Sequence, residues 1–485
     1  MSGARQSKWT HPSSRVCHHA GVTTRSRPAE LGAEFAGEVI GPDDAAYEQA
    51  RKVWNAMVDR RPALIVRPTG TGEVQAAVRL GRARGWEISV RCGGHSIVGH
   101  SVTDGGLMID LSRMRGVDVD VDRRVARVQG GALLRDLDQA SAHHGLHTPA
   151  GVVSHTGVAG LALGGGEGWL GRQLGLTCDS LLRAEVVSAT GELMVASDAD
   201  DADLLWALRG GGGNFGIVTE FTFALHPIRS EVVAVDCFYG PDDSVAVLRG
   251  LRELAATAPD ETTFAAWVGT AGPWEFLPAE LHGQTLVNLS FIHVGDPEVG
   301  RALVPAMRAL APVLAEDAEE LSFLKLQSYS DGAMAHGHRR YWKSHYLTEL
   351  TDDAIEAFLS RGGPVADGEL VANGNLEARG GAQGRIGPED TAFANRDAAF
   401  SWITMAVWDD PAEDAARMGA ARRFADAMAP FASGVYVNAL TENADGAEQA
   451  LDDAYRPRHL ARLAALKARY DPDNVFHLNQ NIAPA

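Results

Sequence analysis

The sequence predicts an α+β protein built from two domains, and three observations lead to this prediction. A strand–helix–strand pattern occupies residues 63–92, as in a parallel pair of strands with a helical crossover. Residues 145–180 are rich in glycine, carry few charges and show no regular hydrophobic period. After Pro227 the composition changes, and residues 229–435 mix strands with amphipathic helices.

Length and composition narrow the possible classes of protein. The 485 residues are 45% hydrophobic and carry a net charge of −19. These values exclude a disordered chain, and the acidic balance excludes nucleic acid as the main partner. No apolar stretch reaches the ~18 residues of a membrane span, and no apolar leader is found near the N-terminus. We therefore expect a cytoplasmic protein that binds no membrane.

Neither the cysteines nor the histidines near the N-terminus indicate a disulfide framework or a metal site. The four cysteines are far apart and form no CxxC pair. His11, Cys17, His18 and His19 lie in the N-terminal segment, which we interpret as a flexible tail over residues 1–34.

The elements of the first domain follow one another at short intervals. Helices are predicted where apolar residues recur every three or four positions, such as Val74, Ala77 and Val78, and strands where short apolar runs end at a turn residue. The predicted elements are, in order, a helix from residue 43, a strand over 63–66, a helix over 71–83, strands over 88–91, 106–111 and 125–128, and a helix over 132–144.

Beyond the glycine-rich stretch, Thr190-Gly191 marks a hairpin between strands over 182–188 and 193–196. A short helix over 203–209 and a half-buried strand over 217–225 complete this domain. The second domain is expected to contain strands over 232–238, 286–292 and 402–407 and a helix over 297–315, and a last helix is expected over 447–470.

Three glycine-rich loops could hold a phosphate. The segments 166–171 and 211–216 fit GxGxxG, but neither lies between a strand and a helix, so a nicotinamide-type fold is not indicated. The loop Arg91-Cys-Gly-Gly-His-Ser follows a predicted strand, and its backbone N–H groups could converge on a diphosphate. The alternative is a tight turn that His95 merely caps.

Together, RCGGHS, the glycine-rich run 149–181, GGGGNFGIVTEF and the terminal NVFHLNQNI resemble the berberine bridge enzyme-like FAD-linked oxidases, within the vanillyl-alcohol oxidase and p-cresol methylhydroxylase fold. The similarity runs from about residue 35 to the C-terminus, and it is greatest to bacterial members of secondary metabolism. It implies an FAD-binding domain over 35–228, a substrate-binding domain over 229–440, and a C-terminal segment over 441–485 that returns to the first.

The resemblance also implies which residues hold FAD. His95 would carry a covalent bond to the flavin, which makes the flavin a stronger electron acceptor and prevents its loss. Arg91, Gly93, Gly94 and Ser96 would bind the diphosphate, and Asn479 and Asn481 would reach the flavin ring. The remaining implied cofactor contacts are Cys92, Ser101, Pro149, Gly151, Thr156, Gly157, Val158, Gly160 and Gly165, with Gly216, Ile217 and Val218 on the adenosine side.

The sequence departs from the family at three positions. Many relatives form a second flavin bond through a cysteine where this chain has Val153, so we expect a single link. The catalytic tyrosine and glutamate of plant relatives are replaced by Ala439 and Arg385. Arg385 could instead favour an ionised substrate.

The proton acceptor therefore has to be sought elsewhere. The candidate catalytic residues are Tyr346, Glu377, Arg385 and Tyr436, and Trp267 and Trp402 are expected to line the pocket. For each of these side chains, ordinary packing or surface placement is the alternative.

We expect a monomeric or homodimeric oxidase that transfers hydride from a small organic substrate to FAD, with dioxygen as the second substrate and peroxide as product. One alternative is a flavin-dependent oxygenase acting on a polyketide-like substrate. Another is a flavin-binding protein without turnover.

Overall fold

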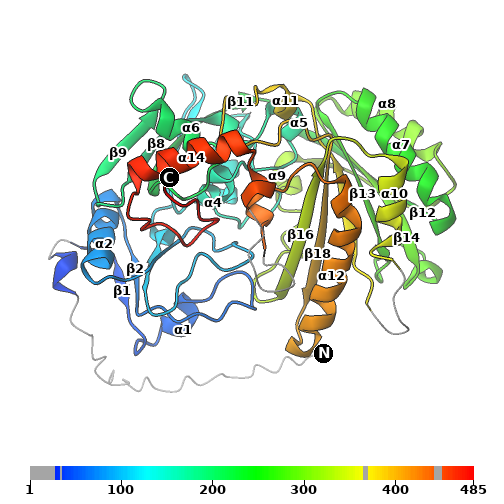
Figure 1. The fold of residues 1–485 in the computed structure, drawn as a ribbon. Coiled ribbons are helices and arrows are strands. Elements are labelled where there is room, and N and C mark those ends of the chain that lie inside the picture. Colours follow the sequence, from blue (N-terminus) through cyan, green and yellow to red (C-terminus); the bar gives the residue numbers. More distant parts are fainter. Residues whose placement is uncertain (1–27, 33–34, 364–369, 442–450) are drawn as a thin grey trace, which may run out of the picture.

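Three large β-sheets organise the computed structural model, which describes residues 28–32, 35–363, 370–441 and 451–485 (Figure 1). Most of the tail predicted over 1–34, with its histidines and Cys17, lies outside these residues. Two of the sheets come from residues 38–224 and the third from residues 231–408. None of the helices in the described ranges is long and apolar enough to cross a membrane.

The first sheet has the order β1-β2-β4-β3. Its strands are β1 (Glu38–Ile40), β2 (Leu64–Arg67), β3 (Ile88–Arg91) and β4 (Leu107–Asp110), with helix α2 (Thr71–Ala83) between β2 and β3. The predicted parallel pairing of β2 with β3 is wrong, because β4 lies between them and runs parallel to both. Leu107, Met108 and Ile109 are fully buried, so β4 suits the position between two neighbouring strands.

The helix expected from residue 43 is a single turn, α1 (Tyr47–Ala50). The chain then leaves the helical path, and Trp54 donates its backbone N–H to the carbonyl of Gly94 at 3.0 Å. A tertiary contact thus overrides the helical spacing of the apolar residues.

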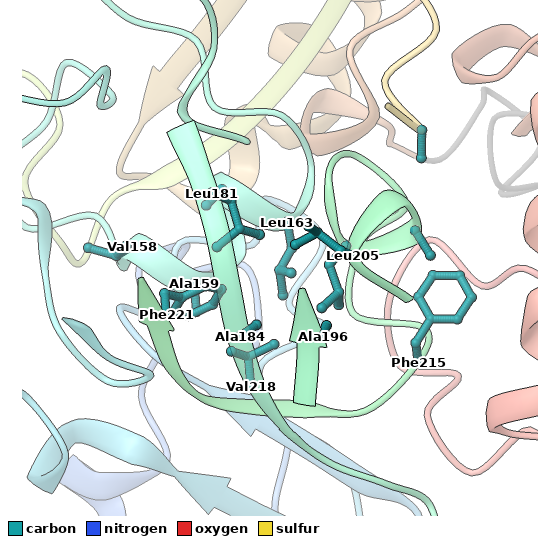
Figure 2. Packing of buried hydrophobic residues seen from close by; sticks show 14 of the residues in the cluster. Val158, Ala159, Leu163, Leu181, Ala184, Ala196, Leu205, Phe215, Val218 and Phe221 are labelled. Atoms are coloured by element: carbon teal, nitrogen blue, oxygen red, sulfur yellow. The ribbon is translucent and has the colours of Figure 1, made fainter. Parts of the chain in front are cut away.

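The second sheet has the order β5-β6-β10-β8-β9, and the predicted hairpin of β8 with β9 is confirmed. Figure 2 shows part of its core, in which Phe221 of β10 and Ala184 of β8 belong to one hydrophobic cluster with Ala159 and Leu163 of α4. The strands are β5 (Val117–Asp120), β6 (Val125–Gln129), β8 (Leu181–Val187), β9 (Leu193–Ser197) and β10 (Ile217–Ala224). The helices are α3 (Leu134–Ala142), α4 (Val158–Leu163), α5 (Gly171–Leu174) and α6 (Ala202–Leu208), and β7 (Leu146–His147) pairs with β11 (His226–Pro227).

The third sheet has seven strands in the order β15-β12-β14-β13-β17-β18-β16, every neighbouring pair antiparallel. They are β12 (Glu231–Tyr239), β13 (Thr262–Thr270), β14 (Thr285–Val294), β15 (Val313–Ser322), β16 (Arg339–Leu347), β17 (Gly374–Ala378) and β18 (Phe400–Trp408). The associated helices are α7 (Ser244–Thr257), α8 (Pro297–Arg308), α9 (Phe323–Leu326), α10 (Asp352–Ser360), α11 (Ala382–Arg385) and α12 (Asp414–Met428).

The helix predicted over 297–315 begins where expected, but it is shorter than predicted. It ends at Arg308, and β15 begins at Val313. Pro312 explains the change, because a proline disfavours helical geometry in the residue before it and cannot donate a helical hydrogen bond.

One face of the third sheet is apolar and is covered by α7, α8, α10 and α12. Trp402 belongs to this face, is fully buried, and packs edge-on against Phe424 of α12 at 4.8 Å between ring centroids. The expectation that Trp402 lines a pocket is therefore wrong. Since side chains alternate along a strand, the opposite face, called the open face below, is free of these four helices, although Val232 and Ile292 on it pack against Leu170.

The C-terminal part returns to the first domain. The part of the predicted helix over 447–450 lies outside the described residues. The remainder is divided into α13 (Leu451–Ala454) and α14 (Pro457–Tyr470), because Pro457 holds Arg456 in an extended conformation. α14 runs beside α6 (Figure 1). Val435 already packs in the core of the second sheet, ahead of the boundary expected at residue 441.

A fully buried ion pair fixes this segment. Lys467 Nζ lies 2.6 Å from Asp471 Oδ2 and also donates to the carbonyls of Asn214 and Phe476 at 2.8 and 2.9 Å. Asp471 in turn accepts the backbone N–H groups of Val475 and Phe476. Helix α14, the 211–216 loop and the last residues are thereby tied together.

We predict that Lys467→Met lowers the free energy of unfolding by about 3–5 kcal/mol, because it leaves Asp471 buried without its cation. The matched control is Arg469→Met on the same helix, whose side chain is 58% exposed and should matter little. Urea unfolding of both variants checks this. Equal stability of the two would contradict it.

Candidate active site

The RCGGHS loop follows β3 and packs closely against the glycine-rich run. A Cβ at Gly93 would collide with the backbone nitrogen of Gly157, so only glycine lets the two segments meet. Gly94 has φ +73°, a left-handed conformation that favours glycine. Arg91, at the end of β3, forms an ion pair with the buried Asp110 and donates to the carbonyl of Ala50 at 2.8 Å.

His95 lies among aromatic rings and imidazoles. Its ring stacks on Trp54 with 4.8 Å between centroids, and its Nε2 lies 2.8 Å from His155 Nδ1. His336 is close to both, and one ring nitrogen from each of His95, His155 and His336 lies within 4.8 Å of the other two. This spacing would also suit a metal ion, although the sequence predicted none. Burial, together with His155, His336 and Arg340, lowers the pKa of His95 to about 2.

A cavity of about 490 Å³ adjoins these imidazoles, with His155 and His336 in its wall. Its lining contains five basic side chains, of which Arg67 and Arg91 pair with Asp110 and Arg115 pairs with Asp136, and basic groups of this kind suit a diphosphate. The basic residues that line it are Lys52, Arg67, Arg91, Arg115 and Arg135. The arrangement therefore fits the FAD implied by the sequence.

The C-terminal asparagines support the same fit. The side-chain oxygens of Asn479 and Asn481 are buried and have no hydrogen-bond partner in the protein, as is also true of Ser101 Oγ. Buried polar atoms normally have a partner, so these three predicted cofactor residues are suited to a polar ligand. Ile217 and Val218 differ, because their side chains pack in two hydrophobic cores.

A single row of residues crosses the open face of the third sheet. The register places Asp236, Ser290, Ala265, Glu377, Ser401 and Tyr346 directly opposite one another in turn on β12, β14, β13, β17, β18 and β16. Asp236 accepts hydrogen bonds from Ser290 Oγ and from Asn288 Nδ2. Trp267 lies two residues beyond Ala265 on the same face of β13.

At one end of this row, the third sheet meets the glycine-rich loop. Tyr346 is fully buried, and its hydroxyl donates to Glu167 Oε1. Glu167 forms a 2.7 Å ion pair with Arg379, whose guanidinium also lies 3.5 Å from Glu377. Tyr436 joins from the other side, accepting from the backbone N–H of Gly166 at 3.1 Å and from Asn438 Nδ2 at 2.9 Å.

Three of the four predicted catalytic residues thus come together, while Glu167 and Arg379 were missed. Glu167 interrupts a run of glycines, and Gly165 and Gly166 have φ +120° and +86°, which lets the loop reach Tyr346. An acidic residue within such a run was the available signal. Arg379 had no comparable signal in the sequence.

The interior position of this cluster changes its acid–base properties. Burial, and next the charge of Glu167, raises the pKa of Tyr346 well above its usual value. Burial likewise raises the pKa of Tyr436 and of Glu377. The tyrosines are therefore protonated at neutral pH, and neither acts as a free phenolate.

Arg385 does not belong to the cluster. Its side chain is 63% exposed and pairs with Asp260 at 2.6 Å, so the sequence prediction that it acts on the substrate is corrected. It follows Gly380-Gly381 in sequence, but the short helix α11 turns it towards solvent.

The cysteines of the described residues are poor nucleophiles. Burial raises the pKa of Cys92 to about 11, and burial also raises the pKa of Cys178 well above its usual value. Cys92 Sγ contacts the carbonyl of Ala132 at 3.3 Å, and Cys178 packs beside Tyr346 and Phe393.

Comparisons with known proteins agree with the resemblance. Residues 62–197 match the family described as FAD binding domain, and residues 435–483 match the family described as berberine and berberine like. The chain is 30% identical over 460 residues to (R)-6-hydroxynicotine oxidase of Paenarthrobacter nicotinovorans, covering 92% of this chain and 97% of that protein. It is 29% identical over 476 residues to glucooligosaccharide oxidase of Sarocladium strictum, covering 90% of each.

Solved structures confirm the predicted fold class. The crystal structure of 6-hydroxy-D-nicotine oxidase from Arthrobacter nicotinovorans has a TM-score of 0.79 and 27% identity, covering 96% of this chain and 100% of that chain. Glucooligosaccharide oxidase from Acremonium strictum has a TM-score of 0.82 and 26% identity, covering 94% and 99%. Its FAD is described as 6-S-cysteinyl and 8α-N1-histidyl.

We predict that Arg379→Met lowers the free energy of unfolding by about 3–5 kcal/mol, since it leaves Glu167 and Glu377 inside the site without a cation. Arg385→Met removes an arginine six residues away that points to solvent, and should leave stability unchanged. Chemical unfolding distinguishes the two. A larger loss for Arg385→Met would show that the cluster is assigned wrongly.

Proposed function

The chain belongs to the berberine bridge enzyme-like family of FAD-dependent oxidoreductases, and on that premise we propose that it oxidises a small organic substrate in secondary metabolism. The proposed reaction removes a hydride from a C–H bond next to an oxygen or nitrogen. The flavin is bonded to His95 alone, and dioxygen is reduced to peroxide. Because the chain is an oxidoreductase, the non-catalytic alternative is set aside.

One observation carries the proposal: the hydrogen-bonded cluster of Tyr346, Glu167 and Arg379, where the open face of the third sheet meets the glycine-rich loop. The family resemblance implies that the glycine-rich loop lies along the flavin. A substrate at this junction therefore contacts both the flavin and the side chains of the cluster. Glu377, in the same row as Tyr346, adds a second carboxyl group to the cluster, 3.5 Å from the Arg379 guanidinium.

The flavin, when bound, supplies the acceptor for the hydride and passes its electrons to dioxygen. The chain's own residues manage the proton. Because Tyr346 donates to Glu167, its oxygen can accept a proton from the substrate while its own proton passes to the carboxylate. Arg379 holds the carboxylate in place and balances its charge.

The substrate we propose is polar and extends away from the reacting carbon. Five strand spacings of ~4.8 Å separate Tyr346 from Asp236, about 24 Å along the row. The row offers the hydrogen-bonding groups of Ser401, Glu377, Ser290 and Asp236. Trp267 adds an aromatic surface beside it, as pockets for ring-containing ligands commonly do.

The first experiment screens alcohols, sugars, amines and phenolic polyketides for bleaching of the flavin without oxygen. Substrates found in this way are then oxidised under labelled dioxygen. We expect stoichiometric peroxide and no label in the product. Incorporation of the label would instead establish the flavin-dependent oxygenase.

We predict that Tyr346→Phe slows anaerobic flavin reduction about 10²- to 10⁴-fold, because the proton acceptor is lost. Tyr436→Phe should cost less than about tenfold, since its hydroxyl accepts bonds that hold the loop. Stopped-flow reduction with substrates of different pKa checks the assignment. A pH midpoint that follows each substrate's own pKa, and is unchanged in Tyr346→Phe, would show that the substrate arrives already ionised.

We predict a single flavin bond. Val153 has no nucleophile and the Cys92 and Cys178 thiols stay protonated, so the flavin should survive acid precipitation of the wild type and be lost from His95→Ala. Because Cys92 and His95 share a tryptic peptide, tandem mass spectra must locate the adduct. An adduct on either cysteine contradicts the prediction.

A further inference from the structure

We infer that His155 is the built-in proton acceptor with which the chain bonds its own flavin to His95. The inference rests on the covalent link proposed above and concerns how that link is made. It begins from one contact, the 2.8 Å approach of His95 Nε2 to His155 Nδ1. Neither the glycine motif nor the family positions in the sequence pointed to His155.

The two nitrogens of His95 have different surroundings. Nε2 lies 2.8 Å from His155 Nδ1, and Nδ1 lies 3.4 Å from Thr156 Oγ1, while a hydrogen bond with the backbone of His155 also reaches the His95 ring. When Nε2 carries the proton and donates it to His155, the lone pair of Nδ1 is free to act as a nucleophile. This is the arrangement by which a neighbouring base activates a nucleophile in general.

The surroundings also keep His95 neutral, as a nucleophilic imidazole must be. Its ring is enclosed by Trp54 on one side and by His155 and His336 on others. The charged groups around these rings are Arg340, which lies over Trp54, and Arg91. Both are cations, and no carboxylate is among the groups that perturb His95 or His336.

His155 is held firmly in its place. The preceding residue, Ser154, is bound through its backbone N–H and its hydroxyl to Asp331, at 2.8 and 2.6 Å. The following residue, Thr156, donates its N–H to the carbonyl of Val153. The ring lines the 490 Å³ cavity together with His336, so a proton received from His95 has a polar route away from the site.

The step balances with dioxygen as oxidant. A bond forms between His95 Nδ1 and the 8α carbon of the flavin, the 8α carbon loses one proton, and His95 loses its Nε2 proton to His155. The two electrons released remain with the flavin until dioxygen takes them. Together with two protons they form hydrogen peroxide, and His155 returns to its neutral state.

The test compares wild type, His155→Phe and the exposed-histidine control His144→Phe. Incompletely flavinylated protein is incubated with FAD in air and EDTA. Bound flavin is measured by absorbance and covalent flavin by its retention through acid. We expect His155→Phe to bind FAD but to attach it about a hundredfold more slowly, with partial rescue by added imidazole. His144→Phe should behave as wild type.

The other possible results distinguish failure of the covalent link from failure of the role proposed for His155. If wild type carries no flavin on His95, the proposed covalent link itself fails. If wild type is flavinylated and His155→Phe attaches flavin at the same rate, only the role of His155 is overturned. Loss of FAD binding in His155→Phe overturns it too, because the side chain is then structural. The role of His155 is also overturned if EDTA abolishes flavin attachment in the wild type and zinc restores it, since the three imidazoles would then bind a metal ion.

Discussion

The ion pair between Glu167 and Arg379 is the contact on which the arrangement of the site depends. It joins the glycine-rich loop of the first domain to the residue that directly follows β17 in the second domain. Charges held inside a protein are stable only with partners, and Arg379 has three, with Glu377 at 3.5 Å and Gln383 Oε1 at 2.7 Å beside Glu167. Its carbonyl, in addition, accepts from Arg172. The loop cannot shift against the sheet without breaking this set of bonds, and Tyr346 is positioned by it.

Local sequence signals predicted local structure well. Helix α2 and strand β3 have the expected bounds, because one apolar face and one short apolar run suffice to define them. Errors arose where distant segments decide the outcome. Strand β4 lies between β2 and β3, and contacts with the 92–106 loop shorten α1, neither of which appears in the pattern of a single segment. The end of α8 and the break between α13 and α14 had local causes, Pro312 and Pro457, that could have been used.

The residues of the candidate site also fall into two groups, those that a local motif reveals and those that only the fold brings together. His95 and its glycines could be found because one contiguous motif contains them. Tyr346 and Glu377 could be named but not joined, since their proximity follows from the register of β16, β17 and β18. His155, His336 and Arg379 come from separate segments, and each resembles an ordinary polar residue until the chain is folded. Arg385 shows the reverse error, because its place in a motif did not reveal that its side chain points to solvent.

The buried Lys467–Asp471 pair has a consequence for the order of assembly. Phe476 and Ile482 pack in two hydrophobic cores. The other residues of these cores come mainly from the first 225 positions, and the rest come from loops near residues 392 and 435–440 and from helices α13 and α14. The cofactor-binding half is therefore interrupted in sequence by the seven-stranded sheet and closes only with the final dozen residues. Completion of this half, and with it the final shape of the cofactor groove, consequently waits until the residues of the seven-stranded sheet have left the ribosome.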